Sequence, residues 1–220
     1  MAAPITFYFD FISPYAFVAW TQIHRIANEH GVRVDPKPIL FAALLDAYGH
    51  KGPAEIPPKR IYTFKDAFRK AHRYWLPPLV PPPSHPFLPL LALRVAATIE
   101  DELARRAACD ALFAATWLRG AGIDTPERVA DALRGAGLDA EALIARASSD
   151  EAKALLRRNT DAALADGAFG VPTMIAAGEL FWGVDALDAL SDFLAGRDPV
   201  AASGLAKWMD VPASAKRPGS

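Results

Sequence analysis

Residues 4–20 read PITFYFDFISPYAFVAW, and the fold can be worked out from this strand-to-helix stretch. Residues 4–10 alternate aromatic and β-branched side chains, which favours a β-strand. Ser13 and Pro14 follow at once, and serine is a preferred helix N-cap while proline is tolerated at the first helical position. Apolar residues then recur at helical spacing, so the sequence predicts a helix that Gly31 ends.

Strands are also predicted on either side of a long helical region. Residues 32–41, VRVDPKPILF, read as a strand whose two prolines favour a sheet edge or an irregular beginning. Together with the opening strand and helix they form a right-handed βαβ unit. Near the other end, a strand over 171–176, a turn at Gly178 and a strand over 180–182 precede a helix over about 184–195. The expected fold is α/β, with a four-stranded mixed sheet.

The region between these two ends shows helical patterns and no convincing strand. Its predicted helices cover 59–74, roughly 89–119, a short helix from Thr125 to Gly135, one capped by Asp139, and one behind the capping box Ser148-x-x-Glu151. We therefore expect residues 1–41 and 166–212 to form the α/β domain, 42–165 a large all-α insertion, and 213–220 a loose tail.

Composition excludes several classes of function. The 220 residues carry a formal net charge of −1, so nothing draws the chain to nucleic acid or to an anionic membrane. The first residues resemble neither a signal peptide nor a membrane span, so a cytoplasmic location is expected. The single cysteine, Cys109, excludes an intrachain disulfide and a CxxC pair, and we expect it to be a buried apolar residue. The five histidines lack metal-site spacing, so no metal is expected.

Two features suggest a ligand site. Ser13 lies at the N-terminus of a helix, where free N–H groups and the helix dipole favour an anion such as a thiolate; the simpler interpretation is an ordinary N-cap. Val171-Pro172 opens a strand, and a cis peptide there would expose the backbone of Val171 to an extended peptide; the simpler interpretation is a trans proline at a strand edge. Neither feature decides the question alone.

Together these pieces resemble one family across nearly the whole chain. FYFDFISPYAFVA near the start, and FGVPTM followed by FWGVDALDAL near the end, are similar to the 2-hydroxychromene-2-carboxylate isomerases, relatives of kappa-class glutathione transferases in the DsbA-like thioredoxin superfamily. The segments from Lys59 to Arg69, HPFLPL around Phe87, and Ser148-Ser149-Asp150 fall between them in the family order. The resemblance implies a thioredoxin-like fold with a helical insertion, and glutathione as the bound thiol.

The resemblance also implies roles for individual residues. Ser13 occupies the place of the nucleophilic cysteine of DsbA-type oxidoreductases and is expected to keep the glutathione sulfur a thiolate. Val171, before Pro172, is expected to pair with the cysteinyl backbone of glutathione, and Asp185 to hold its γ-glutamyl ammonium. Lys59 is expected near the glycine carboxylate and the substrate. In the family reaction the thiolate adds reversibly to an unsaturated acid, which rotates and expels the thiol as the trans isomer.

The sequence departs from the family pattern at three positions that bear on recognition of the carboxylate-bearing substrate. Ala186 replaces the arginine of WGxDR, Leu88 replaces an asparagine, and His50 stands where the kappa class has one. His50 and Tyr62 are the weaker candidates for contact with substrate. Two other functions stay open: a kappa-like glutathione transferase that conjugates electrophiles, and a non-catalytic module that binds peptides at Val171-Pro172. Family members are often dimers, so a homodimer is possible.

Overall fold

The computed structural model describes residues 3–200, 211–212 and 214. The tail predicted over 213–220 lies outside the described residues, apart from Ser214. No helix in the described part of the chain is long and apolar enough to cross a membrane.

The sheet has the predicted four strands. These are β1 (Ile5–Phe9), β2 (Val34–Pro38), β3 (Thr173–Ala176) and β4 (Glu179–Trp182), in the spatial order β2-β1-β3-β4. β1 pairs in parallel with β2 and antiparallel with β3, which is antiparallel to β4. The mixed α/β sheet split by a helical region is therefore confirmed. β2, the strand with Pro36 and Pro38, lies at an edge, as its prolines suggested.

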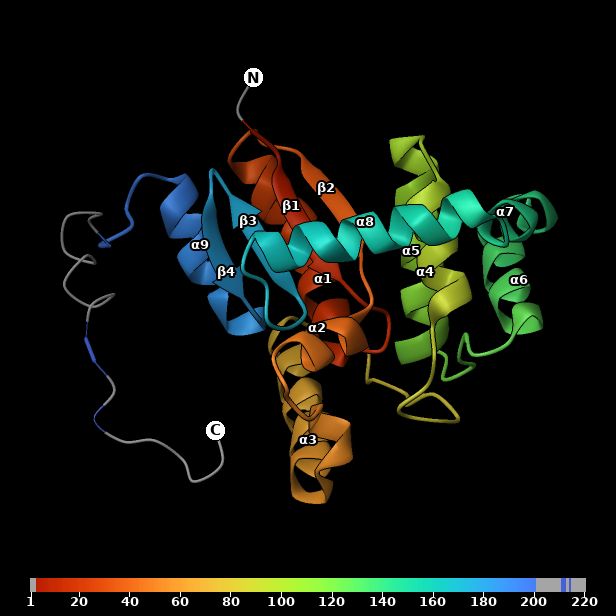
Figure 1. The fold of residues 1–220 in the computed structure, drawn as a ribbon, viewed down its shortest axis with the longest axis horizontal. Helices are drawn as coiled ribbons and strands as arrows, with labels where there is room; N and C mark the ends of the chain where they lie inside the picture. The colour runs from red at the N-terminus through yellow and green to blue at the C-terminus, as the bar shows by residue number, and fades with distance from the viewer. Residues whose placement is uncertain (1–2, 201–210, 213, 215–220) are drawn as a thin grey trace.

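Helices account for most of the remaining chain (Figure 1). They are α1 (Pro14–Glu29), α2 (Phe41–Ala47), η1 (Pro53–Glu55), α3 (Pro57–Arg73), α4 (Leu90–Thr98), α5 (Glu102–Trp117), α6 (Pro126–Gly135), α7 (Ala140–Ala147), α8 (Asp150–Ala165), η2 (Val184–Ala186) and α9 (Leu187–Leu194). Between β2 and β3, the described chain forms helices and no strand, as expected for the insertion.

Side chains on the two faces of β1 pack in two different hydrophobic clusters. Ile5, Phe7 and Phe9 are fully buried on one face, where they share a core with α1 and the insertion. Tyr8 points to the other face, packs in the second cluster with α8 residues such as Ala163, and donates its hydroxyl to Asp166 at 2.7 Å. Figure 1 accordingly shows α8 crossing one face of the sheet, with α1 behind it.

The helical insertion and the sheet share one hydrophobic core. Phe113 of α5 lies with its ring centroid 5.5 Å from Phe9 and 4.7 Å from Phe11. Trp20 of α1 completes this aromatic cluster, 6.0 Å from Phe113. Because the same buried cluster runs from β1 into α4, α5 and α6, the insertion supports the strand-to-helix turn directly.

Two sequence predictions about helix boundaries were wrong. The single helix expected over 89–119 is two helices, α4 and α5, because Asp101 caps a new helix by accepting the Ala104 N–H at 2.8 Å. Ser148 does not cap α8, since it ends α7. Ser149 is the cap, and its hydroxyl accepts the Ala152 N–H at 3.2 Å.

Candidate active site

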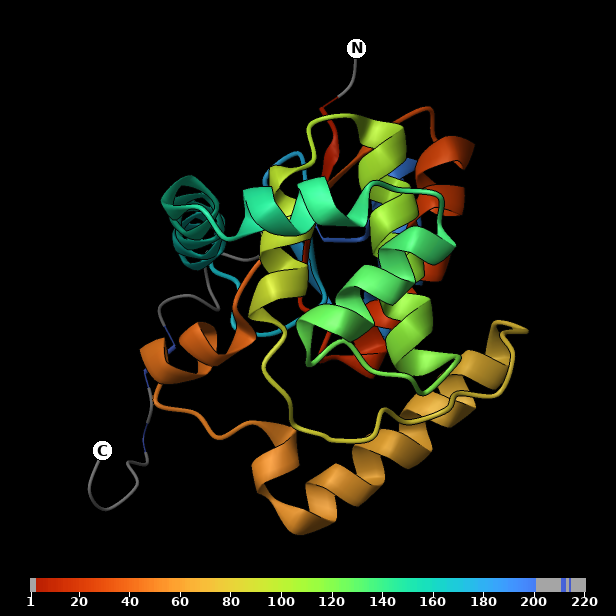
Figure 2. The same cartoon turned by 90° about the vertical axis from the view of Figure 1, so that its right-hand side faces the viewer.

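A cavity of about 890 Å³ opens beside the start of α1. One wall is the turn before α1 together with residues 169–171, and a second wall is formed by α2, η1 and the first turns of α3. The loop 85–89, between α3 and α4, closes a third side. Figure 2 shows α3 along the lower edge of the molecule, and the segment after it returning to α4.

Ser13 lies buried at the turn into α1, 8% exposed, and lines this cavity. Its hydroxyl oxygen accepts the Ala16 N–H at 3.1 Å, which makes Ser13 the N-cap that the sequence predicted. The same hydroxyl lies 3.5 Å from the carbonyl oxygen of Val171, well beyond the 2.7–2.8 Å typical of a good O–H···O bond. The hydroxyl proton is therefore free to be redirected to a ligand without the loss of a strong hydrogen bond.

Two side chains anchor the turn that carries Ser13 by hydrogen bonds to its backbone carbonyls. Trp117 of α5 donates its indole N–H to the carbonyl of Phe11 at 2.9 Å. The Nε2 atom of His85 lies 3.1 Å from the carbonyl of Ile12, and a carbonyl only accepts, so Nε2 carries the proton. Burial lowers the pKa of His85, which keeps its imidazole neutral. The turn is held in place from the helical insertion before any ligand arrives.

Asp10 also stabilises this turn by hydrogen bonds. Its carboxylate is 1% exposed and accepts the N–H groups of Ile12 at 3.1 Å and Phe41 at 3.0 Å, while its carbonyl accepts the Ser13 N–H at 3.1 Å. Burial raises the pKa of Asp10 to about 6, against the lowering effect of the two N–H groups. Sequence reasoning did not select Asp10 or His85. A charged residue interrupting an apolar strand was the signal available for Asp10.

Val171-Pro172 has the cis peptide that the sequence suggested. Val171 lines the cavity, and within the described residues its N–H has no hydrogen-bond partner, because the β3 ladder begins only at Thr173. Pro172 is not among the lining residues, and its carbonyl accepts the Gly183 N–H at 2.9 Å. An unpaired N–H next to Ser13 is suited to bind an extended peptide backbone. A second cis bond, His85-Pro86, was not predicted.

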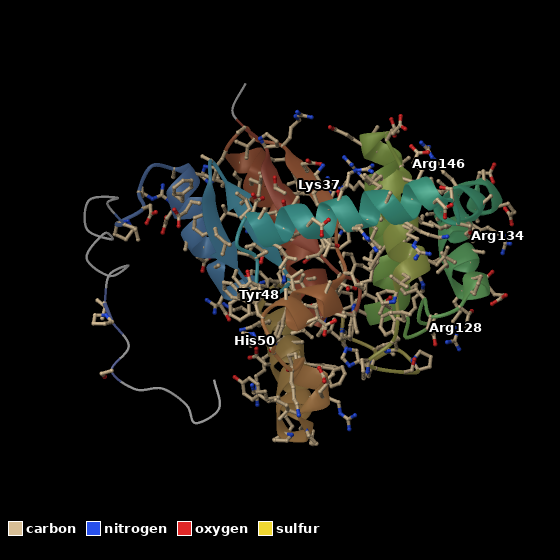
Figure 3. All side chains as sticks on the ribbon, in the orientation of Figure 1. Lys37, Tyr48, His50, Arg128, Arg134 and Arg146 are labelled. Carbon is tan, nitrogen blue, oxygen red and sulfur yellow. The ribbon has the colours of Figure 1, made fainter. Side chains whose placement is uncertain are left out.

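The second wall carries basic side chains. Lys51, Lys59 and Arg60 line the cavity, and none of them forms an ion pair with any residue in the described ranges. Glu55, on the same wall, accepts the Gly52 N–H at 2.5 Å. His50 also lines the cavity, and Figure 3 shows it beside Tyr48, below α2. The free cations favour a ligand that carries carboxylates.

Besides Pro172, two predicted site residues lie outside the cavity lining. Tyr62 projects from α3 with 61% of its surface exposed. Asp185 follows β4, and its side chain, 79% exposed, binds Lys70 Nζ at 2.7 Å. Lys70 also contacts Asp66 at 3.3 Å, and Asp66 accepts the hydroxyl of Tyr15 at 2.8 Å. The structure therefore brings Ser13, Val171, Lys59 and His50 to one cavity, and places Asp185 in an ion-pair network that reaches the cavity through Tyr15.

Two aromatic residues that the sequence did not assign to the site form its rim. Trp182 is 51% exposed and lines the cavity, with its ring centroid 5.1 Å from that of Phe169. It crosses so close to Gly170 that a Cβ there would lie 2.6 Å from the indole nitrogen. Phe181 is buried, because alternate residues of β4 face opposite sides.

Comparison with known proteins agrees with this geometry. A family model described as DSBA-like thioredoxin domain matches residues 4–195. The chain belongs to the DSBA-like thioredoxin family. The one cysteine of this chain, Cys109, is fully buried, and burial raises the pKa of its thiol.

Relatives similar to this chain include enzymes of two kinds. A 2-hydroxychromene-2-carboxylate isomerase of Sphingobium xenophagum is 32% identical over 198 residues, 88% of this chain and 99% of that protein. Glutathione s-transferase kappa 2 of Caenorhabditis elegans is 31% identical over 206 residues, 87% of this chain and 91% of that protein. A solved 2-hydroxychromene-2-carboxylate isomerase superposes with a TM-score of 0.78 at 28% identity, covering 87% of this chain and 94% of that one.

Proposed function

We propose that this DSBA-like protein is a glutathione-dependent cis–trans isomerase that acts on a small, aromatic-derived unsaturated acid. The observation that carries the proposal is the buried Ser13 hydroxyl at the helix N-terminus, next to the unpaired N–H of Val171, in a chain with no cysteine at that position. Bound glutathione supplies the thiolate that adds to the substrate double bond. The relatives named above support this class of reaction.

The residues of the cavity fit glutathione in size and chemistry. A tripeptide fills only part of about 890 Å³, so a second, apolar molecule can lie beside it. Val171 offers an N–H to the peptide backbone, and Lys59 offers a cation to its glycine carboxylate. The hydroxyl of Ser13 and the N-terminus of α1 together stabilise negative charge on sulfur.

The role of Asp185 in this proposal depends on Lys70. The ammonium of the γ-glutamyl group competes with Lys70 for the exposed oxygen of Asp185. Because Asp66 holds Lys70 from the other side at 3.3 Å, Lys70 stays near and can bind the γ-glutamyl carboxylate while Asp185 binds the ammonium. The pair therefore suits a zwitterionic amino-acid end.

Binding is tested by calorimetry with glutathione on the wild type, Ser13→Ala and Asp185→Ala. We expect measurable binding by the wild type and a loss of affinity in both variants. Tyr62→Ala, which alters an exposed residue outside the cavity, serves as the control for substitution itself. Absence of binding by the wild type at millimolar glutathione contradicts the proposal.

A kappa-like glutathione transferase is the second candidate, and one observation favours it. Ala186 and Leu88 lack the polar groups that the isomerases carry, while the rim formed by Phe169 and Trp182 is apolar, which suits a hydrophobic electrophile. Assays of chromene isomerisation and of conjugation to a generic electrophile separate the two. Turnover of the electrophile alone assigns transferase activity and rejects isomerisation. A homodimer and a cytoplasmic location stay predictions.

A further inference from the structure

Asp10 is an unusual residue for its surroundings, because its buried carboxylate has no cation beside it. No lysine, arginine or histidine in the described ranges forms an ion pair with it, and its partners are two backbone N–H groups. Burying an unpaired carboxylate costs folding free energy, and two backbone N–H groups offset only part of that cost. A neutral side chain would form a more stable core at this position, so stability does not account for a carboxylate here.

The two N–H groups belong to two different segments that line the cavity. Ile12 lies in the turn that carries Ser13, and Oδ1 of Asp10 closes that turn at 3.1 Å. Phe41 is the first residue of α2, and Oδ2 of Asp10 holds it at 3.0 Å. Both residues line the cavity, and α2 leads on to the segment with Lys59. One carboxylate thus links the Ser13 wall to the basic wall.

We propose that Asp10 is a positioning residue, whose two oxygens hold the Ser13 turn and the start of α2 at the separation that one glutathione molecule needs to contact both walls. The inference rests on the proposed glutathione site. Only a carboxylate can do this, because each of its oxygens accepts a hydrogen bond, whereas an amide accepts with one atom and presents N–H groups with the other.

Phe41 offers a test that leaves Asp10 untouched. Phe41→Pro removes the N–H that Asp10 binds, and proline is tolerated at the first position of a helix. The preceding residue, Leu40, already has φ −89° and ψ 103°, the extended conformation that a residue before proline requires. Phe41→Ala removes the same ring but keeps the N–H, so the difference between the two variants isolates the hydrogen bond to Asp10.

The primary measurement is the Kd for glutathione by calorimetry. Phe41→Pro should bind about tenfold more weakly than Phe41→Ala, as expected for the loss of a hydrogen bond to a charged group. Asp10→Asn should show a similar loss. Asp139→Asn is the matched control, because Asp139 also accepts a backbone N–H, that of Ala142 at 3.0 Å, but at the far end of the molecule. Its affinity should equal that of the wild type.

A pH profile distinguishes positioning from a general packing defect. With S-methylglutathione, which has no thiol to titrate, wild-type affinity should fall as the pH drops through about 6 and Asp10 is protonated, and Asp10→Asn should lack this step. The other titratable or charged side chains that line the cavity are common to both proteins: Tyr15, His50, Lys51, Glu55, Lys59, Arg60 and His85. Hydrogen exchange at residues 10–13 and 40–45 should rise in Phe41→Pro relative to Phe41→Ala.

The outcomes separate this inference from the proposed function. If the wild type binds no glutathione, the proposed function fails and the inference fails with it. If the wild type binds, while Phe41→Pro matches Phe41→Ala and Asp10→Asn keeps the wild-type affinity and pH profile, only the role of Asp10 is overturned. If Asp10→Asn does not fold, the comparison between the two Phe41 variants decides the matter.

Discussion

Ser13 has two separable roles, and two substitutions distinguish them. As the N-cap of α1 it accepts the Ala16 N–H at 3.1 Å, and replacing such a cap by alanine costs about 1 kcal/mol, but by glycine only a few tenths. For a chain of this length, 1 kcal/mol lowers the Tm by roughly 2–4 °C. We therefore expect Ser13→Ala to lower the Tm by that amount and Ser13→Gly to change it little.

Both substitutions remove the hydroxyl that is proposed to stabilise the bound thiolate. A hydrogen bond to a charged acceptor contributes about 1.5–3 kcal/mol, so the thiol of bound glutathione should titrate roughly 1–2 pKa units higher in both variants than in the wild type. Ultraviolet thiolate absorbance of the complex, followed against pH, measures this shift. The same titration in all three proteins refutes the role of the hydroxyl, and a shift in Ser13→Ala alone assigns it to the lost cap.

Further predictions concern stability and reactivity. The pKa of Asp10, about 6, lies above its ordinary value, so the folded chain binds this proton more tightly than the unfolded chain, and the free energy of unfolding falls as the pH rises from about 4 to 6. Asp10→Asn should remove up to about 3 kcal/mol of that fall, measured by urea unfolding at several pH values. Parallel curves of unfolding free energy against pH for the two proteins would contradict this. Gly170→Ala places a Cβ against Trp182, so we expect altered tryptophan fluorescence and a loss of about 1 kcal/mol or less, because the exposed indole can turn away. Gly135→Ala in α6, where a Cβ meets nothing within 4 Å, should instead stabilise by about 0.5–1 kcal/mol; destabilisation there would refute the packing argument. Cys109 should react with a thiol reagent only at the rate of unfolding, and rapid labelling of the native chain would show that it is accessible.

Local patterns in the sequence predicted most of the strands and helices. Alternation in residues 4–10, the cap at Ser13 and the prolines of β2 each reflect a physical preference of a few neighbouring residues, and all three are found as expected. The break between α4 and α5 was missed because Ile99 and Glu100 continue an apolar and polar helical pattern, and only the capping aspartate at 101 marks the new start.

The site was predictable to the extent that it depends on local geometry. The N-cap at Ser13 follows from the residue type and was predicted, whereas the cis bond before Pro172 was one of two alternatives that the sequence left open. The tether from Asp10 to Phe41 spans 31 residues, and the ion pair from Lys70 to Asp185 spans 115. Such contacts depend on how distant elements pack, which no local pattern in one sequence encodes.

The prolines of β2 also determine what the sheet can do with another protein. Two residues that flank the strand bond to β1, Arg33 through its carbonyl and Ile39 through its N–H. The backbone groups of the alternate positions 34, 36 and 38 therefore point away from β1, toward the open edge of the sheet. Two of these three, Pro36 and Pro38, have no N–H to donate. A strand of another chain therefore cannot form a regular ladder of hydrogen bonds along this edge, which protects the sheet there from the edge-to-edge pairing that begins aggregation.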